Sequence, residues 1–313
     1  MIPSKQIVIE AGDRVAPFVH RTPVLTSRLL NEMVGAEVFF KCENLQKMGA
    51  FKMRGAINAI QQLSEAQKKA GVVTHSSGNF GQALALAAKN LGVNAYIVMP
   101  SSAPAVKIEA VKSYGGLVTI TEPTLEAREK SAANIVAEKG AVFLHPSNDL
   151  NVIVGQGTAA LELLQDQPGL EYVMSPVGGG GLIAGTALAA HYLGKNCRVI
   201  GAEPMEVDDA YRAFKSGKIE YNTSTDTIAD GLKTNLGDIN FPIIMELVSD
   251  IIRVEEGEIV NAMKLIWERM KLVIEPSSAV PFAALLKERE KFKNKKVGII
   301  LSGGNVELSN LPF

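Results

Sequence analysis

Four consecutive glycines, residues 178–181, lie between an apolar run and an Ala- and Leu-rich run in the segment SPVGGGGLIAGTALAA. Ordered glycine costs backbone entropy, so four in a row indicate that a ligand approaches the chain closely. Backbone N–H groups at a strand-to-helix turn bind anions, and the N-terminus of the following helix adds a partial positive charge. The segment therefore predicts a phosphate-binding loop.

This loop alone leaves the identity of the phosphate compound open. A Walker A loop needs lysine and then Ser or Thr after its last glycine, but Gly185 is followed directly by threonine. Gly179, Gly181 and Ala184 satisfy the G-x-G-x-x-A pattern of an NAD site, and Glu203 stands where a ribose-binding acid would follow. A dinucleotide, a cofactor with one phosphate group and a tight turn without ligand all fit.

A second chemical candidate is Lys52, in the stretch GAFKMRGA (49–56), which begins a predicted helix. The residues three and four positions away include no acid, so no carboxylate of the same helix can pair with the amine. Burial and the positive helix N-terminus both lower the pKa of a lysine and make it nucleophilic. Beside a phosphate loop, such a lysine indicates a Schiff base with pyridoxal phosphate (PLP).

Three other stretches carry polar groups at predicted strand ends. HSSGNFGQ (75–82) is a polar turn that opens a helix, and ILSGGN (300–305) ends the last apolar strand. A dinucleotide fold explains neither of these together with Lys52. EPMEVDD (203–209) holds four carboxylates and, taken alone, is typical of a solvated loop.

The chain between these stretches alternates β-branched runs with helical patterns, and Gly92, Gly140, Gly194 and Gly217 stand where glycines end helices. Such alternation predicts an α/β fold with two parallel or mostly parallel open sheets and helices on both faces. Ligands then bind at the carboxyl ends of the strands. Four strand candidates lie in residues 65–146, which predicts a small substrate-binding domain inserted in a large PLP-binding domain formed by 1–64 and 147–313.

Composition excludes several classes of protein. The 313 residues are 47% hydrophobic, as in ordinary globular proteins. Their net charge of −1 provides no excess of positive charge that would bind nucleic acid or an anionic membrane. Two cysteines without CxxC spacing exclude a disulfide scaffold. No leader peptide or membrane-spanning run is recognisable, so we expect a cytoplasmic protein that takes a small-molecule substrate.

Eight stretches, in order and over nearly the whole chain, resemble the fold-type II PLP enzymes, whose fold is like that of tryptophan synthase β. The resemblance is to the serine/threonine dehydratase branch, which includes serine racemase and threo-3-hydroxyaspartate dehydratase. The stretches are FKCENLQKMGAFKMRGA, HSSGNFGQALALAA, HPSNDLNVIVGQGT, VGGGGLIAG, GAEPMEVDDAYRAFKSG, IADGLK, MKLVIEPSSAV and LSGGNVEL.

This resemblance implies the residues that hold the cofactor. Lys52 corresponds to the Schiff-base lysine, and Phe51 packs beside the ring. Asn79 corresponds to the hydrogen-bond donor to the 3-oxygen of the cofactor, and Ser302 faces the ring nitrogen. The cofactor phosphate is held by Gly178, Gly179, Gly180 and Gly181.

The substrate carboxylate is bound, by the same resemblance, at the N–H groups of Ser76, Ser77, Gly78, Asn79 and Phe80. Ser77 matches the serine that protonates the opposite face of the α-carbon in racemases. Phe80 replaces the histidine usual in the family, and Thr234 replaces a serine near the substrate in serine racemase. Both departures bear on substrate preference.

Arg128 lies in TEPTLEAREK, which predicts a helix with Thr124 as its N-cap. No acid stands three or four positions from Arg128, so a solvated surface arginine is one interpretation. The other is that Arg128 faces the cleft, where the resemblance places a substrate-contacting arginine. There it would bind the second carboxylate of 3-hydroxyaspartate.

For the carboxylate cluster, the resemblance implies a divalent ion held by Glu203, the carbonyl of Val207 and Asp209. Glu203, the candidate ribose-binding acid of a dinucleotide site, thereby becomes a candidate metal ligand. Oxygen ligands suit Mg²⁺, Ca²⁺ or Mn²⁺. The family also predicts a homodimer and a nucleotide effector.

The activity implied is β-elimination from L-serine, L-threonine or L-threo-3-hydroxyaspartate to a 2-keto acid and ammonia, together with serine racemase activity. A predominantly serine- or aspartate-type racemase is the alternative. An NAD-dependent dehydrogenase, suggested by the loop pattern, is a remote one.

Overall fold

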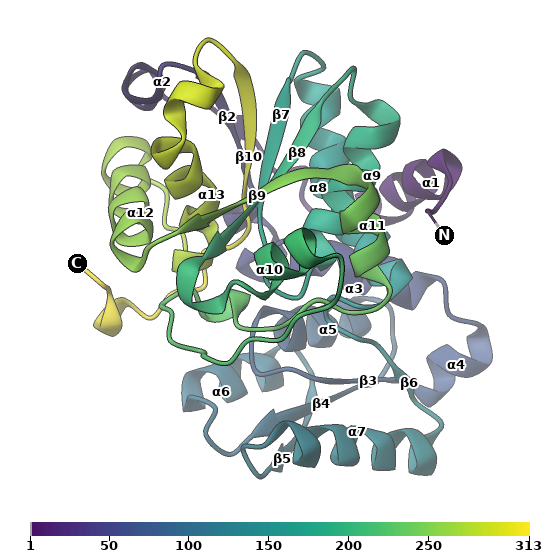
Figure 1. Cartoon of the computed structure of the whole chain (residues 1–313). Coiled ribbons are helices and arrows are strands. Elements are labelled where there is room, and N and C mark those ends of the chain that lie inside the picture. Colours follow the sequence, from purple (N-terminus) through teal and green to yellow (C-terminus); the bar gives the residue numbers. More distant parts are fainter. Residues whose placement is uncertain (1) are drawn as a thin grey trace.

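The computed structural model describes residues 2–313, which contain two β-sheets with helices on their faces (Figure 1). The six-stranded sheet has the order β1-β2-β10-β7-β8-β9, and all of its pairs are parallel except β1 with β2. Its strands are β1 (Val24–Leu25), β2 (Glu37–Cys42), β7 (Tyr172–Pro176), β8 (Arg198–Pro204), β9 (Val248–Val254) and β10 (Lys296–Leu301).

The four-stranded sheet has the order β5-β4-β3-β6 and is parallel throughout. Its strands are β3 (Val72–His75), β4 (Ala95–Pro100), β5 (Leu117–Thr121) and β6 (Val142–Phe143). The predicted α/β fold with mostly parallel sheets is therefore confirmed. This sheet lies inside the segment 65–146, but the domain boundaries at 65 and 146 stay predictions.

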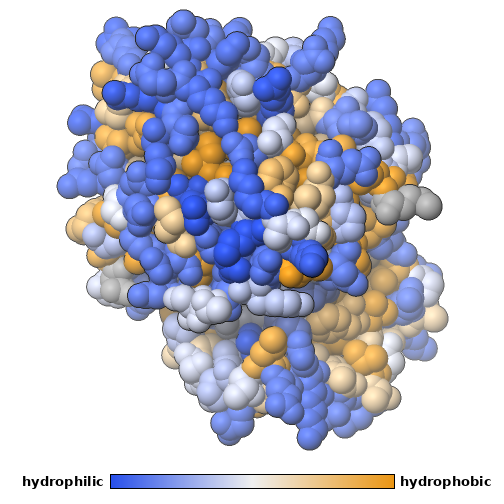
Figure 2. Space-filling view, viewed as in Figure 1, coloured by the Kyte–Doolittle hydropathy of each residue, from blue (hydrophilic) through white to orange (hydrophobic). Residues whose placement is uncertain are grey.

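Most of the helices lie in the connections between parallel strands. The helices are α1 (Lys5–Val15), α2 (Arg28–Val34), α3 (Lys52–Gln61), α4 (Glu65–Ala70), α5 (Asn79–Asn90), α6 (Ala105–Ser113), α7 (Leu125–Lys139), α8 (Leu150–Asp166), α9 (Gly181–Leu193), α10 (Asp209–Ser216), α11 (Asn240–Leu247), α12 (Glu256–Met270) and α13 (Pro276–Lys287). Of these, α1 precedes β1, and α2 joins the antiparallel pair β1 and β2. Figure 2 shows hydrophilic residues over most of one face, with hydrophobic residues in separate groups. Within residues 2–313, no helix has both the length and the apolar composition to cross a membrane.

Helix α8 holds two functional helices at close spacing, because it packs against both α3 and α9. A Cβ on Gly155 would lie 2.6 Å from Cβ of Asn58 on α3, and a Cβ on Gly157 would meet the backbone of Gly185 on α9. Only glycine permits this approach. The helix that begins at Lys52 and the helix that follows the glycine loop are therefore locked to the same partner.

A buried cluster of charges fixes the first turns of α3. Arg54 on α3 bonds Glu43 at 2.7 Å and Glu162 of α8 at 2.8 Å, and Lys41 of β2 bonds Glu162 at 2.6 Å. Two cations and two carboxylates balance each other in the core, where an unpaired charge would be strongly destabilising. The position of α3 is thus tied to β2 and α8.

Candidate active site

A cavity of about 640 Å³ lies where several strands end. Its walls include residues directly after β3, β7 and β10, namely 76–80, 178–181 and 302. Carboxyl ends of parallel strands are where α/β proteins bind ligands. The cavity brings together Phe51, Lys52, Ser76, Ser77, Gly78, Asn79, Phe80, Arg128, Gly178, Gly179, Gly180, Gly181, Thr234 and Ser302, so every predicted site residue outside the metal set lines it.

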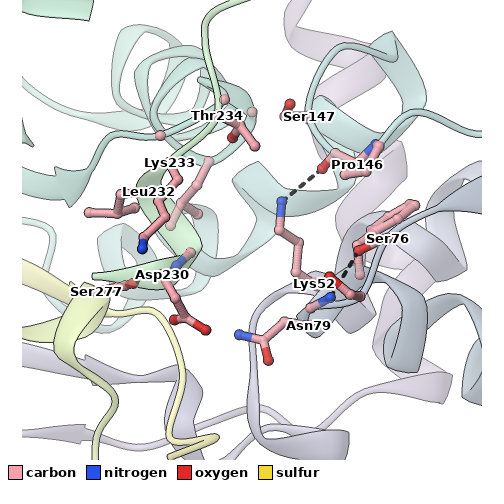
Figure 3. A pocket seen from close by; sticks show the side chains of 18 of the residues that line it. Lys52, Ser76, Asn79, Pro146, Ser147, Asp230, Leu232, Lys233, Thr234 and Ser277 are labelled. Atoms are coloured by element: carbon pink, nitrogen blue, oxygen red, sulfur yellow. Dashed lines mark hydrogen bonds between the residues drawn. The ribbon is translucent and has the colours of Figure 1, made fainter. Parts of the chain in front are cut away.

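Lys52 is the first residue of α3, and its side chain extends to the carbonyl of Pro146 (Figure 3). Nζ donates to that oxygen at 2.8 Å and lies 4.9 Å from the ring centroid of Phe51. Burial lowers the pKa of Lys52 to about 7, although the carboxylate of Glu275 opposes the shift. A neutral amine at this pKa is a competent nucleophile and base near neutral pH.

The glycine loop forms a tight cradle before α9. Gly180 has φ of +79°, a conformation that favours glycine, and Gly181 begins the helix. A Cβ on Gly178 would lie 2.7 Å from Cα of Leu232, and a Cβ on Gly179 would collide with the Ser147 side chain. The first N–H groups of α9 lack helical acceptors and suit a phosphate. The cradle and Lys52 share one cavity, so these residues fit PLP.

The polar turn 76–80 leads directly into α5, which starts at Asn79. The N–H of Gly78 donates to Oγ of Ser76 at 3.3 Å, and all five residues of the turn line the cavity. A helix N-terminus with a serine-rich turn favours an anion such as a carboxylate. The predicted carboxylate-binding role of this turn stays a prediction.

Glu275 is a site residue to which the sequence analysis gave no role. Its carboxylate accepts from Asn79 Nδ2 at 3.0 and 3.1 Å, lines the cavity and is buried. Burial, with the nearby charge of Asp230, raises the pKa of Glu275 to about 7. The only available signal was its place in MKLVIEPSSAV, directly before the proline that starts α13.

Two serines stand at the end of β10 and the start of α13. Ser302 is buried, lines the cavity and lies 3.0 Å, Oγ to Oγ, from Ser278. Ser278 in turn bonds the carbonyl and the N–H of Gly303, each at 2.7 Å. The hydroxyl of Ser302 is therefore anchored and available at the cavity wall.

Arg128 reaches the cavity from the first turn of α7. Thr124 caps that helix as predicted, accepting from the N–H of Ala127 at 3.1 Å. Arg128 Nε donates to the Thr124 carbonyl at 3.3 Å, and within residues 2–313 its guanidinium has no carboxylate partner. Burial and the charge of Arg128 lower the pKa of His75, which also lines the cavity.

The predicted metal ligands lie outside this cavity, between β8 and α10. Glu203 is fully buried and accepts from the N–H groups of Ala210 at 3.0 Å and Tyr211 at 2.8 Å. Burial, and the like charge of Asp209, raise the pKa of Glu203 well above its usual value. Asp209 accepts from Nδ2 of Asn222 at 2.6 Å and from the N–H of Leu236 at 3.0 Å, so the oxygens of both carboxylates already accept hydrogen bonds from the chain. Within residues 2–313 no group of three or more His, Cys, Asp or Glu side chains could hold a metal; the predicted set has only two, plus a carbonyl.

The sequence profile of the family described as pyridoxal-phosphate dependent enzymes matches residues 15–303. The chain is 51% identical to a serine racemase of Dictyostelium discoideum, over 96% of this chain and 94% of that protein. It is 48% identical to a β-hydroxyaspartate dehydratase of Paracoccus denitrificans, over 100% of this chain and 99% of that one. The solved structure of maize serine racemase superposes with a TM-score of 0.96 at 46% identity, over 99% of this chain and 95% of that one.

Proposed function

The chain belongs to the family of pyridoxal-phosphate dependent enzymes, and from that premise we propose that it is an ammonia-lyase for β-hydroxy-α-amino acids with racemase activity. Its substrates are L-serine, L-threonine and L-threo-3-hydroxyaspartate. Each loses water by β-elimination, and hydrolysis of the resulting enamine consumes one water, so the net products are a 2-keto acid and ammonia. One observation carries the proposal: the Lys52 amine, with its pKa near 7, shares a cavity with the glycine cradle.

PLP, when bound, supplies an electron sink for the pair left on the substrate α-carbon. Gly178–Gly181 would hold its phosphate, and Ser302 would face its ring. Nζ of Lys52 removes the α-proton, and the turn 76–80 orients the substrate carboxylate. The β-hydroxyl leaves with a proton as water, and hydrolysis of the released enamine gives the keto acid and ammonia.

Racemisation needs a second proton carrier on the opposite face of the α-carbon. Ser77 lines the cavity on the turn that binds the carboxylate and takes this role. Ser77→Ala should therefore depress D-serine formation from L-serine far more than pyruvate formation. Equal losses in the two assays would contradict this division between Lys52 and Ser77. A wild-type chain that forms D-serine faster than pyruvate from L-serine would favour a racemase as the main function.

The cofactor assignment is tested by the visible absorbance of the purified protein. We expect Lys52→Ala to lose both the absorbance of the lysine-bound cofactor and turnover. Lys107 and Lys233 also line the cavity, so a loss in this variant assigns the cofactor linkage to Lys52. Lys69→Ala, a change at an exposed lysine, is the control. A cofactor that borohydride still fixes to the Lys52→Ala chain would refute the assignment.

Mg²⁺, or Ca²⁺ or Mn²⁺, is proposed at Glu203, the Val207 carbonyl and Asp209. A cation between the two buried carboxylates would bind the folded chain only, and so raise its stability by mass action. EDTA should lower the melting temperature of the wild-type chain and leave that of Asp209→Asn unchanged. A wild-type melting temperature that ignores EDTA would remove the metal from the proposal.

A homodimer and a nucleotide effector stay predictions from the family resemblance, and a cytoplasmic location stays a prediction from the sequence.

A further inference from the structure

Two buried amide side chains hold residues 146–147, a segment to which the mechanism above gives no role. Gln156 Nε2, on α8, donates to the Pro146 carbonyl at 3.0 Å. Asn240 Nδ2, on α11, donates to the Ser147 carbonyl at 2.9 Å and to the Gly179 carbonyl at 2.8 Å. Both amides are fully buried. The segment is thereby tied to α8 on one side and to the glycine loop on the other.

The Pro146 carbonyl is also the acceptor for the Lys52 amine, at 2.8 Å (Figure 3). A carbonyl oxygen only accepts, so Gln156 must turn its NH₂ toward it, and Lys52 must turn an N–H toward it. The lone pair of the neutral Lys52 amine therefore points away from Pro146. The hydrogen bond from Lys52 Nζ to the Pro146 carbonyl thus fixes both the position of the nitrogen and the direction of its lone pair.

The other end of the Gln156 amide reaches the glycine loop. Its Oε1 has no hydrogen-bond partner within residues 2–313 and lies 2.5 Å from where a Cβ on Gly181 would be. Gln156 thus spans the distance from the acceptor of the Lys52 amine to the first residue of α9. A single side chain therefore bonds the acceptor of the Lys52 amine and lies against the first residue of the helix that follows the glycine loop.

Building on the proposed function, we propose that the Pro146 carbonyl is the resting acceptor of the Lys52 amine whenever that amine is not bonded to the cofactor. Gln156 is the positioning residue that holds this carbonyl in place. An uncharged acceptor suits the task because it binds the amine in either protonation state and favours the ammonium form less than a carboxylate would. The titratable groups facing the amine are Glu275, directly before α13, and His145. Burial and the neighbouring His75 and Lys52 lower the pKa of His145 to about 4, so its imidazole is neutral near neutral pH.

The test measures how fast cofactor-free protein captures added PLP, followed by visible absorbance across a range of pH. Gln156→Met removes both polar atoms from a side chain of similar length, and we expect capture to slow about tenfold, as for one lost hydrogen bond. Gln156→Glu places a carboxylate beside the Lys52 amine, which should raise the pH midpoint of capture by about one unit. Gln165→Met, on the exposed side of the same helix, is the matched control and should leave rate and midpoint unchanged.

Wild-type rate and midpoint in both Gln156 variants would overturn the inference while leaving the proposed function intact. Should Gln156→Met fail to fold, as judged by circular dichroism, the midpoint of Gln156→Glu decides alone, since a purely structural role would not move it. A wild-type chain that captures no PLP, or a Lys52→Ala chain that captures it equally well, would instead refute the proposed function.

Discussion

The two sheets of this enzyme are packed very differently. In the six-stranded sheet, β10 buries all residues but its first, and the adjacent α8 buries every residue from Val152 to Leu164. In the four-stranded sheet, the edge strand β5 buries no residue, and α7 buries only Ala132. The dense half supplies the glycine cradle and the supports of Lys52. The thin edge supplies Arg128.

Local stability follows packing, so elements with few buried contacts open at a lower free energy than the core. The cradle must hold one cofactor in one place, and dense packing serves that purpose. A side chain that determines substrate preference, as proposed for Arg128, can lie on a helix that changes position more easily, such as α7. We therefore expect changes in the dense half to alter stability and cofactor capture, and changes at the thin edge to alter preference.

The largest contrast should come from truncating one apolar side chain to alanine in each half. Leu163 of α8 is fully buried, and Leu163→Ala should cost about 2–5 kcal/mol of unfolding free energy through lost burial and a cavity. Val136 of α7 is 36% exposed, and Val136→Ala should cost less than about 1 kcal/mol. Urea unfolding of both variants checks this, and similar losses would mean that α7 is as well anchored as α8.

Glu275 gives the dense half a pH dependence. Its pKa is raised from 4.5 to about 7, so between these values the folded chain binds more protons than the unfolded one. Its contribution to stability is full below pH 4.5 and is lost as pH rises through 7. For the cofactor-free protein this amounts to about 3 kcal/mol, which Glu275→Gln should abolish.

Unfolding free energies of the wild-type and Glu275→Gln chains, measured from pH 4.5 to 8, give the comparison. Glu126→Gln, at an exposed acid on α7, is the control and should follow the wild-type curve. Asp230, Lys107 and Lys52 also face Glu275, so the difference between the two curves, rather than either curve alone, reports this group. Parallel curves would mean that Glu275 stays ionised in the folded chain.

Arg128 should change preference with little effect on stability. A guanidinium without a carboxylate partner can bind the second carboxylate of L-threo-3-hydroxyaspartate, which L-serine lacks. We expect kcat/KM to be higher for the dicarboxylate. Arg128→Ala should then shift the ratio toward serine by about 1.5–3 kcal/mol, the range for a hydrogen bond to a charged group.

Two further variants sharpen this result. Arg128→Lys should lose part of the preference, because an ammonium keeps the charge but not the two-pronged geometry. Lys130→Ala, at an exposed neighbour, should keep the full preference. A drop of equal size for both substrates in Arg128→Ala would show that the arginine has a structural role only.

The alternation of strands and helices predicted the fold because it follows from local patterns, and the glycine runs and Lys52 marked the cavity. Three strands of the six-stranded sheet, β1, β2 and β9, were not recognised. β2 contains Lys41, a charge that reads as solvent-facing, whereas the structure pairs it with Glu162 in the core. Gly194 ends α9 as predicted, but with φ of −80° rather than a left-handed turn. A Cβ at this position would lie 2.6 Å from Cβ of Cys197, so the close approach rather than the backbone conformation favours glycine here.

The supports of the site could not be predicted in the same way. Gln156 and Asn240 are ordinary polar residues in their helical sequences. Only the packing of α8 and α11 on segment 146–147 places their amides where they donate to the Pro146 and Ser147 carbonyls. Glu275 acquires its raised pKa from burial, which no local pattern encodes. The glycines of α8 carry a signal, but only the fold shows that they face α3 and α9.

The finest test of the contrast uses two helix caps. Asp149 caps α8 by accepting from the N–H groups of Asn151 at 2.8 Å and Val152 at 3.0 Å, and Thr124 caps α7 through Ala127 at 3.1 Å. Replacing either cap with alanine should lower the stability of its helix by about 1 kcal/mol.

Hydrogen exchange separates the consequences of the two replacements. We expect α7 to open while α8 stays folded, whereas α8 opens only when the whole molecule unfolds. Thr124→Ala should speed exchange of α7 amides about fivefold. Asp149→Ala should speed exchange of α8 amides by the same factor and leave the α7 amides at their original rate. If Asp149→Ala speeds both helices equally, α7 and α8 open together, and the difference in packing has no dynamic consequence.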